Sequence, residues 1–119
     1  MLAFLLLPLA LAEVFSVDGT HGFELPHDGT VEFSLKSNPT TGYSWNIVES
    51  DSALQLDSPT GVYQSSSGGR MGGSGKQVFK VSCTADCLAG TQLKIKLHYQ
   101  RPWESEPVKV EELTVDVVA

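Results

Sequence analysis

Apolar and polar residues alternate along most of this chain after residue 13, with the period of two that is typical of β-strands. The clearest case is the segment 93–100, in which Leu, Ile, Leu and Tyr alternate with Lys, Lys, His and Gln. Successive side chains of a strand point to opposite faces, so the apolar residues of this segment share one face. It predicts a half-buried strand with His98 on the outward side.

The same alternation over shorter stretches predicts further strands. They lie at 31–36, 43–48 and 79–83, with a first strand at 13–17 and a short one at 62–64. The short strand interrupts a long connecting segment that is rich in Ser and Gly.

The last strand changes phase. Val108 and Val110 follow one alternation, whereas Leu113, Val115 and Val117 follow the other. If all of them face the core, one extra residue must be absorbed between the two sets. A β-bulge near Glu111 and Glu112 is therefore predicted.

Short strands separated by turn residues, without a helical period or a repeat, predict an all-β fold. We expect an antiparallel β-sandwich of about seven strands, formed as one domain because the chain has only 119 residues. Trp45 is expected in its core. Because Trp45 precedes both cysteines, the Cys-Trp-Cys spacing of antibody-type domains is absent.

The net charge of −6 argues against binding to nucleic acid or to an anionic membrane, because no basic patch is available to neutralise phosphates. The three histidines, His21, His27 and His98, are scattered and match no metal-binding spacing. We expect no metal and no cofactor.

Residues 2–12 are apolar, carry no charge and end in Ala-Leu-Ala, which predicts a secretory signal cleaved after Ala12. The stretch is shorter than the ~20 residues that a membrane helix needs. We expect a signal peptide at 1–12 and a mature domain at 13–119, free of the membrane and either secreted or in an endolysosomal or vacuolar lumen. The alternative is a buried N-terminal strand or helix.

Cys83 and Cys87 are the only two cysteines, and an even number in an exported chain favours a disulfide. The closed loop is small, so the bond should stabilise the fold by only about 2 kcal/mol. The alternative is a buried free thiol at Cys83.

The segment 38–42, here called the first loop, reads Asn-Pro-Thr-Thr-Gly. Pro39 restricts the backbone and Gly42 permits a positive φ, so Thr40 and Thr41 should be held outward on a stiff turn with no role in the core. The alternative is an ordinary turn between two strands.

Two further segments are expected at the same end of the sandwich: the middle loop, 71–75, and the last loop, 101–107. If residues 13–17 form the first strand, the three loops are the second, fourth and sixth connections, and alternate connections often share one end. Arg101 and Trp103 are side-chain types that are enriched in binding hot spots. The alternative for Trp103 is packing against the core.

Over residues 30–118 the chain resembles the chagasin-like inhibitors of papain-type cysteine proteases. The first loop is similar to the central loop of that family, and Arg101-Pro102-Trp103, preceded by Tyr99, is similar to its last loop. The middle loop departs from the family pattern Gly-x-Gly-Gly, since Ser74 stands at a usual glycine position. The two cysteines are not part of the pattern.

The resemblance implies an immunoglobulin-like sandwich whose three loops occlude a protease cleft reversibly and without a covalent bond. It places the two threonines of the first loop over the catalytic Cys-His pair, the middle loop along the non-primed side, and the last loop on aromatic surface of the primed side. The residues implied in binding are Asn38, Pro39, Thr40, Thr41, Gly42, Met71, Gly72, Gly73, Ser74, Gly75, Arg101, Pro102 and Trp103.

Two other classes of function remain open. A secreted immunoglobulin-like adhesion or ligand-binding module would use the same loops on a receptor or a sugar. An enzyme is the weaker alternative, because no nucleophile has a histidine and an acid at a recognisable spacing. We expect a monomeric inhibitor that is not an enzyme and whose partner is a papain-family cysteine protease.

Overall fold

The computed structural model describes residues 14–38, 41–65, 75–84 and 87–119. These residues form nine strands, and no helix among them is long and apolar enough to cross a bilayer. The strands are β1 (Val14–Ser16), β2 (Gly22–Pro26), β3 (Thr30–Ser37), β4 (Ser44–Ser50), β5 (Leu54–Leu56), β6 (Val62–Ser65), β7 (Gly75–Cys83), β8 (Gln92–Gln100) and β9 (Lys109–Val118).

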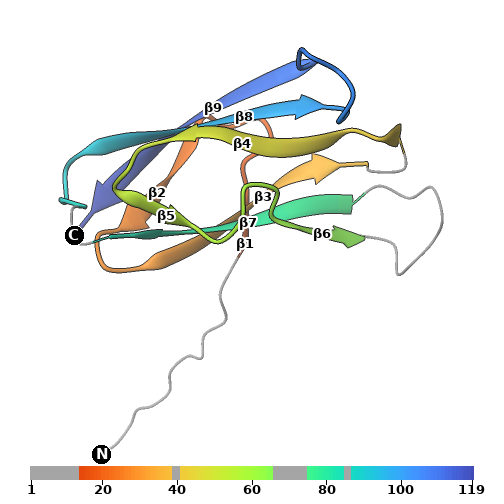
Figure 1. Cartoon of the computed structure of the whole chain (residues 1–119). Helices are drawn as coiled ribbons and strands as arrows, with labels where there is room; N and C mark the ends of the chain where they lie inside the picture. Colours follow the sequence, from red (N-terminus) through yellow and green to blue (C-terminus); the bar gives the residue numbers. More distant parts are fainter. Residues whose placement is uncertain (1–13, 39–40, 66–74, 85–86) are drawn as a thin grey trace, which may run out of the picture.

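The strands form two sheets that pack face to face as a sandwich (Figure 1). One sheet has the order β1-β3-β7-β5, with β6 also paired to β7, and the other has the order β2-β9-β8-β4. The predicted all-β sandwich is confirmed. It has two more strands than expected, because β2 carries glycine and proline at its ends and β5 spans three residues, so neither gives a clear alternation.

Two pairings differ from the antiparallel expectation, since β1 runs parallel to β3 and β2 runs parallel to β9. The chain crosses from β1 to β2 in the other sheet before it returns to β3. Because no hairpin joins β1 and β3, the two strands can run in the same direction. Both sheets are therefore mixed.

The core lies between the inner faces of the two sheets. Phe33 and Phe79 stack at its centre with ring centroids 5.2 Å apart, and Trp45 is buried as predicted. The other buried apolar residues include Val17, Leu25, Val31, Leu35, Leu54, Val81, Ile95, Leu97, Leu113, Val115 and Val117. They come from both sheets, as the alternation along the strands requires.

The predicted bulge near Glu111 and Glu112 is wrong. The register between β8 and β9 is continuous through both residues, so Val110, like the preceding Val108, is exposed instead of turning inward. The antiparallel ladder decides the orientation, because a regular strand cannot bury two opposite phases. The register shift lies instead in β4, at Val48.

A buried glutamine side chain joins the two sheets. β4 is the edge strand of its sheet, and the backbone N–H of Trp45 donates to Gln77 Oε1 of β7 at 2.7 Å. Gln77 Nε2 donates in turn to the carbonyl oxygens of Trp45, at 3.0 Å, and Thr60, at 2.8 Å. One amide thus satisfies both backbone groups of Trp45, as a neighbouring strand would.

The indole of Trp45 adds a further hydrogen bond between the sheets, since Nε1 donates to the carbonyl oxygen of Lys36 at 3.0 Å. Lys36 lies near the end of β3, and Trp45 is the second residue of β4. These bonds fix the start of β4 against β3 and β7. They set the position of the first loop, which connects β3 to β4.

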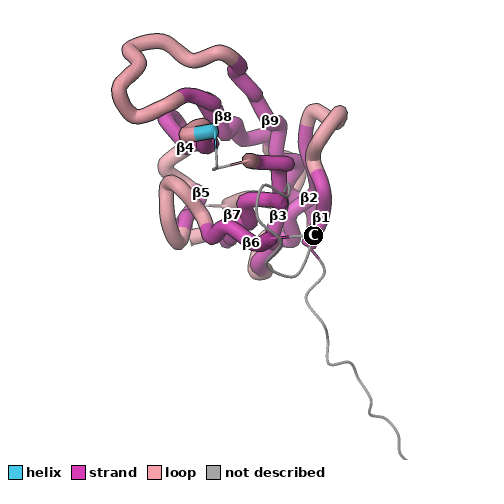
Figure 2. The backbone as a smooth tube through the Cα atoms, turned by 90° about the vertical axis from the view of Figure 1, so that its right-hand side faces the viewer, coloured by secondary structure: helices cyan, strands magenta, loops and turns pink. Residues whose placement is uncertain are grey.

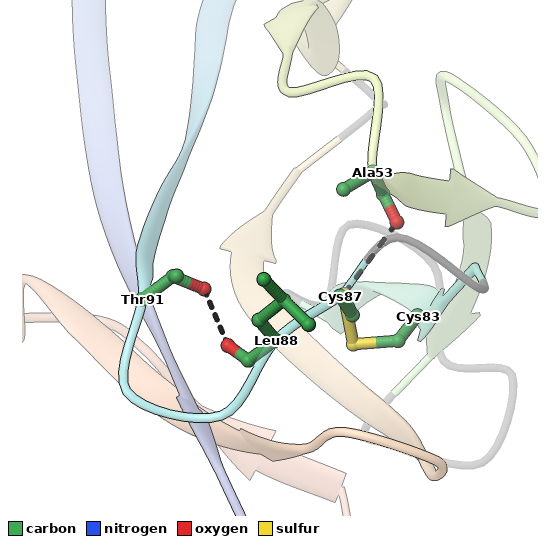
Figure 3. The surroundings of a disulfide bond; sticks show 5 residues. All are labelled: Ala53, Cys83, Cys87, Leu88 and Thr91. Carbon is green, nitrogen blue, oxygen red and sulfur yellow. Dashed lines mark hydrogen bonds between the residues drawn. A yellow bond between two sulfur atoms is a disulfide. The ribbon is translucent and has the colours of Figure 1, made fainter.

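The predicted disulfide between Cys83 and Cys87 is confirmed, and its Cα atoms are 5.4 Å apart (Figure 3). Cys87 is buried, and its Sγ atom lies 3.6 Å from the carbonyl oxygen of Ala53. This is a packing contact, because a disulfide sulfur has no proton to donate. The bond staples the segment after β7, at the end of the sandwich remote from the first loop.

We expect Gln77→Met to lower the free energy of unfolding by roughly 2–4 kcal/mol, because it keeps the volume of the side chain but leaves the two backbone groups of Trp45 buried without partners. Urea denaturation measures the change. Gln55→Met, at an exposed position of β5, is the matched control and should stay within about 0.5 kcal/mol of the parent. Equal stability of both variants would contradict the role of the amide.

Candidate functional site

Six strands begin or end at one end of the sandwich, among them β9, whose first residue, Lys109, pairs with Tyr99 of β8. Ser37, the last residue of β3, and Ser65, the last residue of β6, both pair with Gly75 at the start of β7. In the other sheet Ser44, at the start of β4, pairs with Gln100, at the end of β8. The connections that carry the first, middle and last loops therefore leave from one end, which Figure 2 views directly.

The three connections leave from the same end of the sandwich, as predicted, although the numbering of connections from which this was inferred was wrong. With β2 and β5 included, the three connections are the third, sixth and eighth along the chain. Pro39, Thr40, Met71, Gly72, Gly73 and Ser74 lie outside the described residues. We call the described part of this end the tip, residues 41–43 and 101–104.

In the first loop, both the backbone N–H and the hydroxyl of Thr41 donate to the carbonyl oxygen of Asn38, at 3.1 and 2.7 Å. Thr41 is exposed, as predicted, but its hydroxyl also closes the turn, a role that the sequence did not suggest. Gly42 has the predicted positive φ, 89°. A β-carbon there would lie 3.2 Å from the Trp103 ring, so the glycine also permits close approach of the last loop.

Arg101 joins the last loop to the first. Its Nε donates to the carbonyl oxygen of Thr41 at 3.2 Å, and its guanidinium carbon lies 4.4 Å from the centroid of the Tyr43 ring. The guanidinium also lies 5.7 Å from the Trp103 ring and 4.0 Å from a carboxylate oxygen of Glu104. The other carboxylate oxygen of Glu104 accepts the backbone N–H of Arg101 at 3.3 Å.

Stacked side chains connect the tip to the core. Trp45 and Tyr99 have ring centroids 4.8 Å apart, and Tyr99 and Tyr43 are 5.3 Å apart. Arg101 continues the stack on Tyr43, and Trp103 ends it with 72% of its surface exposed. The prediction that Trp103 lies at the tip, and not in the core, is confirmed. An exposed aromatic side chain is thus held by a series of contacts that begins inside the sandwich.

Gly75 is the one residue of the middle loop that the structure describes. It is buried at the start of β7, and a β-carbon at this position would collide with the carbonyl oxygen of Gln64 and the hydroxyl group of Tyr63. A glycine is needed here because β6 lies so close to β7.

Three contributors to this site were not identified from the sequence. Gln77 occupies the same alternation phase as Phe79 and Val81, and a polar residue in a buried phase is a signal that would have marked it. Tyr43 was expected to begin the strand at 43–48, whereas it precedes β4 and contacts Arg101. For Glu104 the sequence holds no comparable signal.

The geometry defines a class: an immunoglobulin-like sandwich whose loops join into one exposed surface at one end. The profile of the chagasin family of peptidase inhibitors, I42, matches residues 24–117. The chain therefore belongs to the chagasin family of peptidase inhibitors.

Individual relatives agree with this assignment. Amoebiasin-2 of Entamoeba histolytica is 31% identical over 88 residues, which cover 74% of this chain and 68% of that protein. The crystal structure of the cysteine protease inhibitor EhICP2 from Entamoeba histolytica matches with a TM-score of 0.64 and 25% identity, over 87% of this chain and 93% of that one. The solution structure of Amebosin matches with a TM-score of 0.61 and 28% identity, over 87% and 95%.

Proposed function

We propose that this protein is a reversible, non-covalent inhibitor of papain-like cysteine proteases that occludes the active-site cleft with its three loops. The observation that carries the proposal is the union of the first and last loops into one exposed surface at the tip, in a chain of the chagasin family. The similarity to a structure described as a cysteine protease inhibitor supports the class of protease.

The contacts at the tip favour inhibition over cleavage. A protease substrate binds as an extended segment, whereas the first loop is turned, with Thr41 bonded back to Asn38 and Gly42 at positive φ. The carbonyl oxygen of Thr41 is also engaged by Arg101. Extending the loop would break these contacts, so the bound loop resists the geometry that hydrolysis requires.

In the proposed complex, Thr40 and Thr41 lie over the catalytic Cys-His pair. The middle loop pairs its backbone with the non-primed side and offers Met71 to an apolar pocket. Trp103 packs on aromatic surface of the primed side, where an exposed indole is suited to serve as a hot spot. Because the tip is ordered before binding, little conformational entropy is lost on association.

The class of target is tested by titration. We expect the refolded domain to inhibit papain stoichiometrically and reversibly, to be recovered uncleaved, and to leave chymotrypsin fully active. Residual activity is measured with a small fluorogenic substrate, and circular dichroism verifies the fold. Full papain activity at micromolar folded domain would contradict the proposal. Equal inhibition of chymotrypsin would contradict its specificity.

The contribution of Trp103 is tested by Trp103→Ala. We expect the inhibition constant for papain to rise roughly 30-fold, about 2 kcal/mol of binding, while the free energy of unfolding changes by well under 1 kcal/mol. Leu88→Ala is the matched control, because Leu88 is 67% exposed at the opposite end of the sandwich. Loss of folding with unchanged affinity per folded molecule would assign Trp103 a structural role instead.

We also propose that the mature protein, residues 13–119, acts as a monomer in the secretory pathway, either secreted or in an endolysosomal or vacuolar lumen. The Cys83–Cys87 disulfide supports this proposal, since such bonds persist in oxidising compartments. Mass spectrometry of the native protein should find Glu13 at the N-terminus and a mass two hydrogens below that of the dithiol. A protein that retains Met1 and two free thiols would contradict both the cleavage after Ala12 and the oxidising compartment.

A further inference from the structure

We infer that Arg101 is a positioning residue: its guanidinium latches the last loop onto the first loop in the free domain and thereby presents Trp103 to the partner. The inference rests on the proposed function. A positioning role differs from a direct role, in which the same guanidinium would contact the protease.

The surroundings of Arg101 support a role within the domain. The Nε–H is directed to the carbonyl oxygen of Thr41, and the guanidinium lies over the Tyr43 ring. The carboxylate of Glu104 lies beside Nη1 and accepts the backbone N–H of Arg101. The side chain is only 35% exposed, in contrast to the largely exposed Trp103. The guanidinium is therefore already engaged within its own molecule.

Only arginine combines the required properties. Its planar guanidinium can cover an aromatic ring while an N–H at its edge donates within the guanidinium plane, whereas the ammonium of lysine is a compact charge that cannot do both. The charge alone contributes little, because a half-exposed ion pair such as that with Glu104 is weak. The latch therefore depends on the shape of the side chain more than on its charge.

Tyr43 provides the base on which the latch rests. It stacks on Tyr99, whose ring in turn contacts the buried Trp45 at a tilt, so the Tyr43 ring has a fixed place at the tip. Arg101 covers this ring and leads on to Trp103. Removing either Tyr43 or Arg101 breaks the same connection, and the effects of the two changes should not add.

The experiment compares Arg101→Ala, Arg101→Lys, Tyr43→Leu and the double variant Arg101→Ala/Tyr43→Leu. Without the latch only a fraction of molecules presents the last loop correctly, so we expect each single variant to weaken papain inhibition about tenfold. The double variant should inhibit papain as well as the less effective of the two single variants does. Arg101→Lys should resemble Arg101→Ala, and Tyr43→Phe, which keeps the ring, should inhibit like the parent.

Two controls separate the latch from a general effect. Lys96→Met removes a cation that pairs with Glu112 on the outward face of its sheet, and inhibition should be unchanged. The loss caused by Arg101→Ala should also be the same at low and high salt, because the guanidinium acts through its short-range contacts with Thr41 and Tyr43 and not through long-range attraction to the protease. Circular dichroism verifies that every variant is folded.

A direct contact of Arg101 with the protease would give a different pattern and overturn the inference. Arg101→Ala would then weaken inhibition in a salt-dependent way, Tyr43→Leu would have little effect, and the two losses would add. The free domain gives an independent test through its tryptophan fluorescence anisotropy, which should fall in Arg101→Ala and Tyr43→Leu. Trp45 is buried in the core, so the fall reports on Trp103. Unchanged anisotropy would overturn the latch. This measurement needs no protease, so failure of the inference about Arg101 is distinguishable from failure of the proposed function.

Discussion

The buried amide of Gln77 is the interaction on which the organisation of the tip depends. An edge strand leaves backbone groups unpaired on its outer side, and at Trp45 these groups lie inside the protein. Gln77 is 4% exposed and satisfies both of them from the opposite sheet. A hydrophobic residue at this position would fill the space but leave both backbone groups of Trp45 buried without a partner. The hydrogen bonds between Gln77 and Trp45 fix the orientation of Trp45, and the position of the first loop follows from it.

From Trp45 the order of the core extends outward to the exposed surface. Tyr99, Tyr43 and Arg101 stack in sequence and end at Trp103. Each contact is modest in isolation, but together they keep a large apolar side chain in place in water without burying it. Such a surface loses little conformational freedom on binding, as the proposed insertion of a few loops into a protease cleft requires. The disulfide lies at the other end of the sandwich, where it stabilises the scaffold away from the tip.

The sequence predicted those features that depend on local pattern. Alternation identified the long strands, and proline and glycine identified the first loop with its positive φ at Gly42. The assumption that every apolar residue is buried failed for Val108 and Val110, because the register with β8 takes precedence over burial. The pairings of Gln77 with Trp45 and of Arg101 with Thr41 were not predictable, since they join residues 32 and 60 positions apart and depend on how the sheets pack.

Hydrogen–deuterium exchange of the domain with and without papain tests most directly whether the tip is the recognition surface. The account predicts that papain slows amide exchange in the segments 38–44, 66–75 and 100–107. Exchange in the segment 84–91, at the disulfide end, should stay unchanged. Protection confined to the disulfide end or to the outer face of a sheet, with the tip exchanging at the rates of the free domain, would contradict the account.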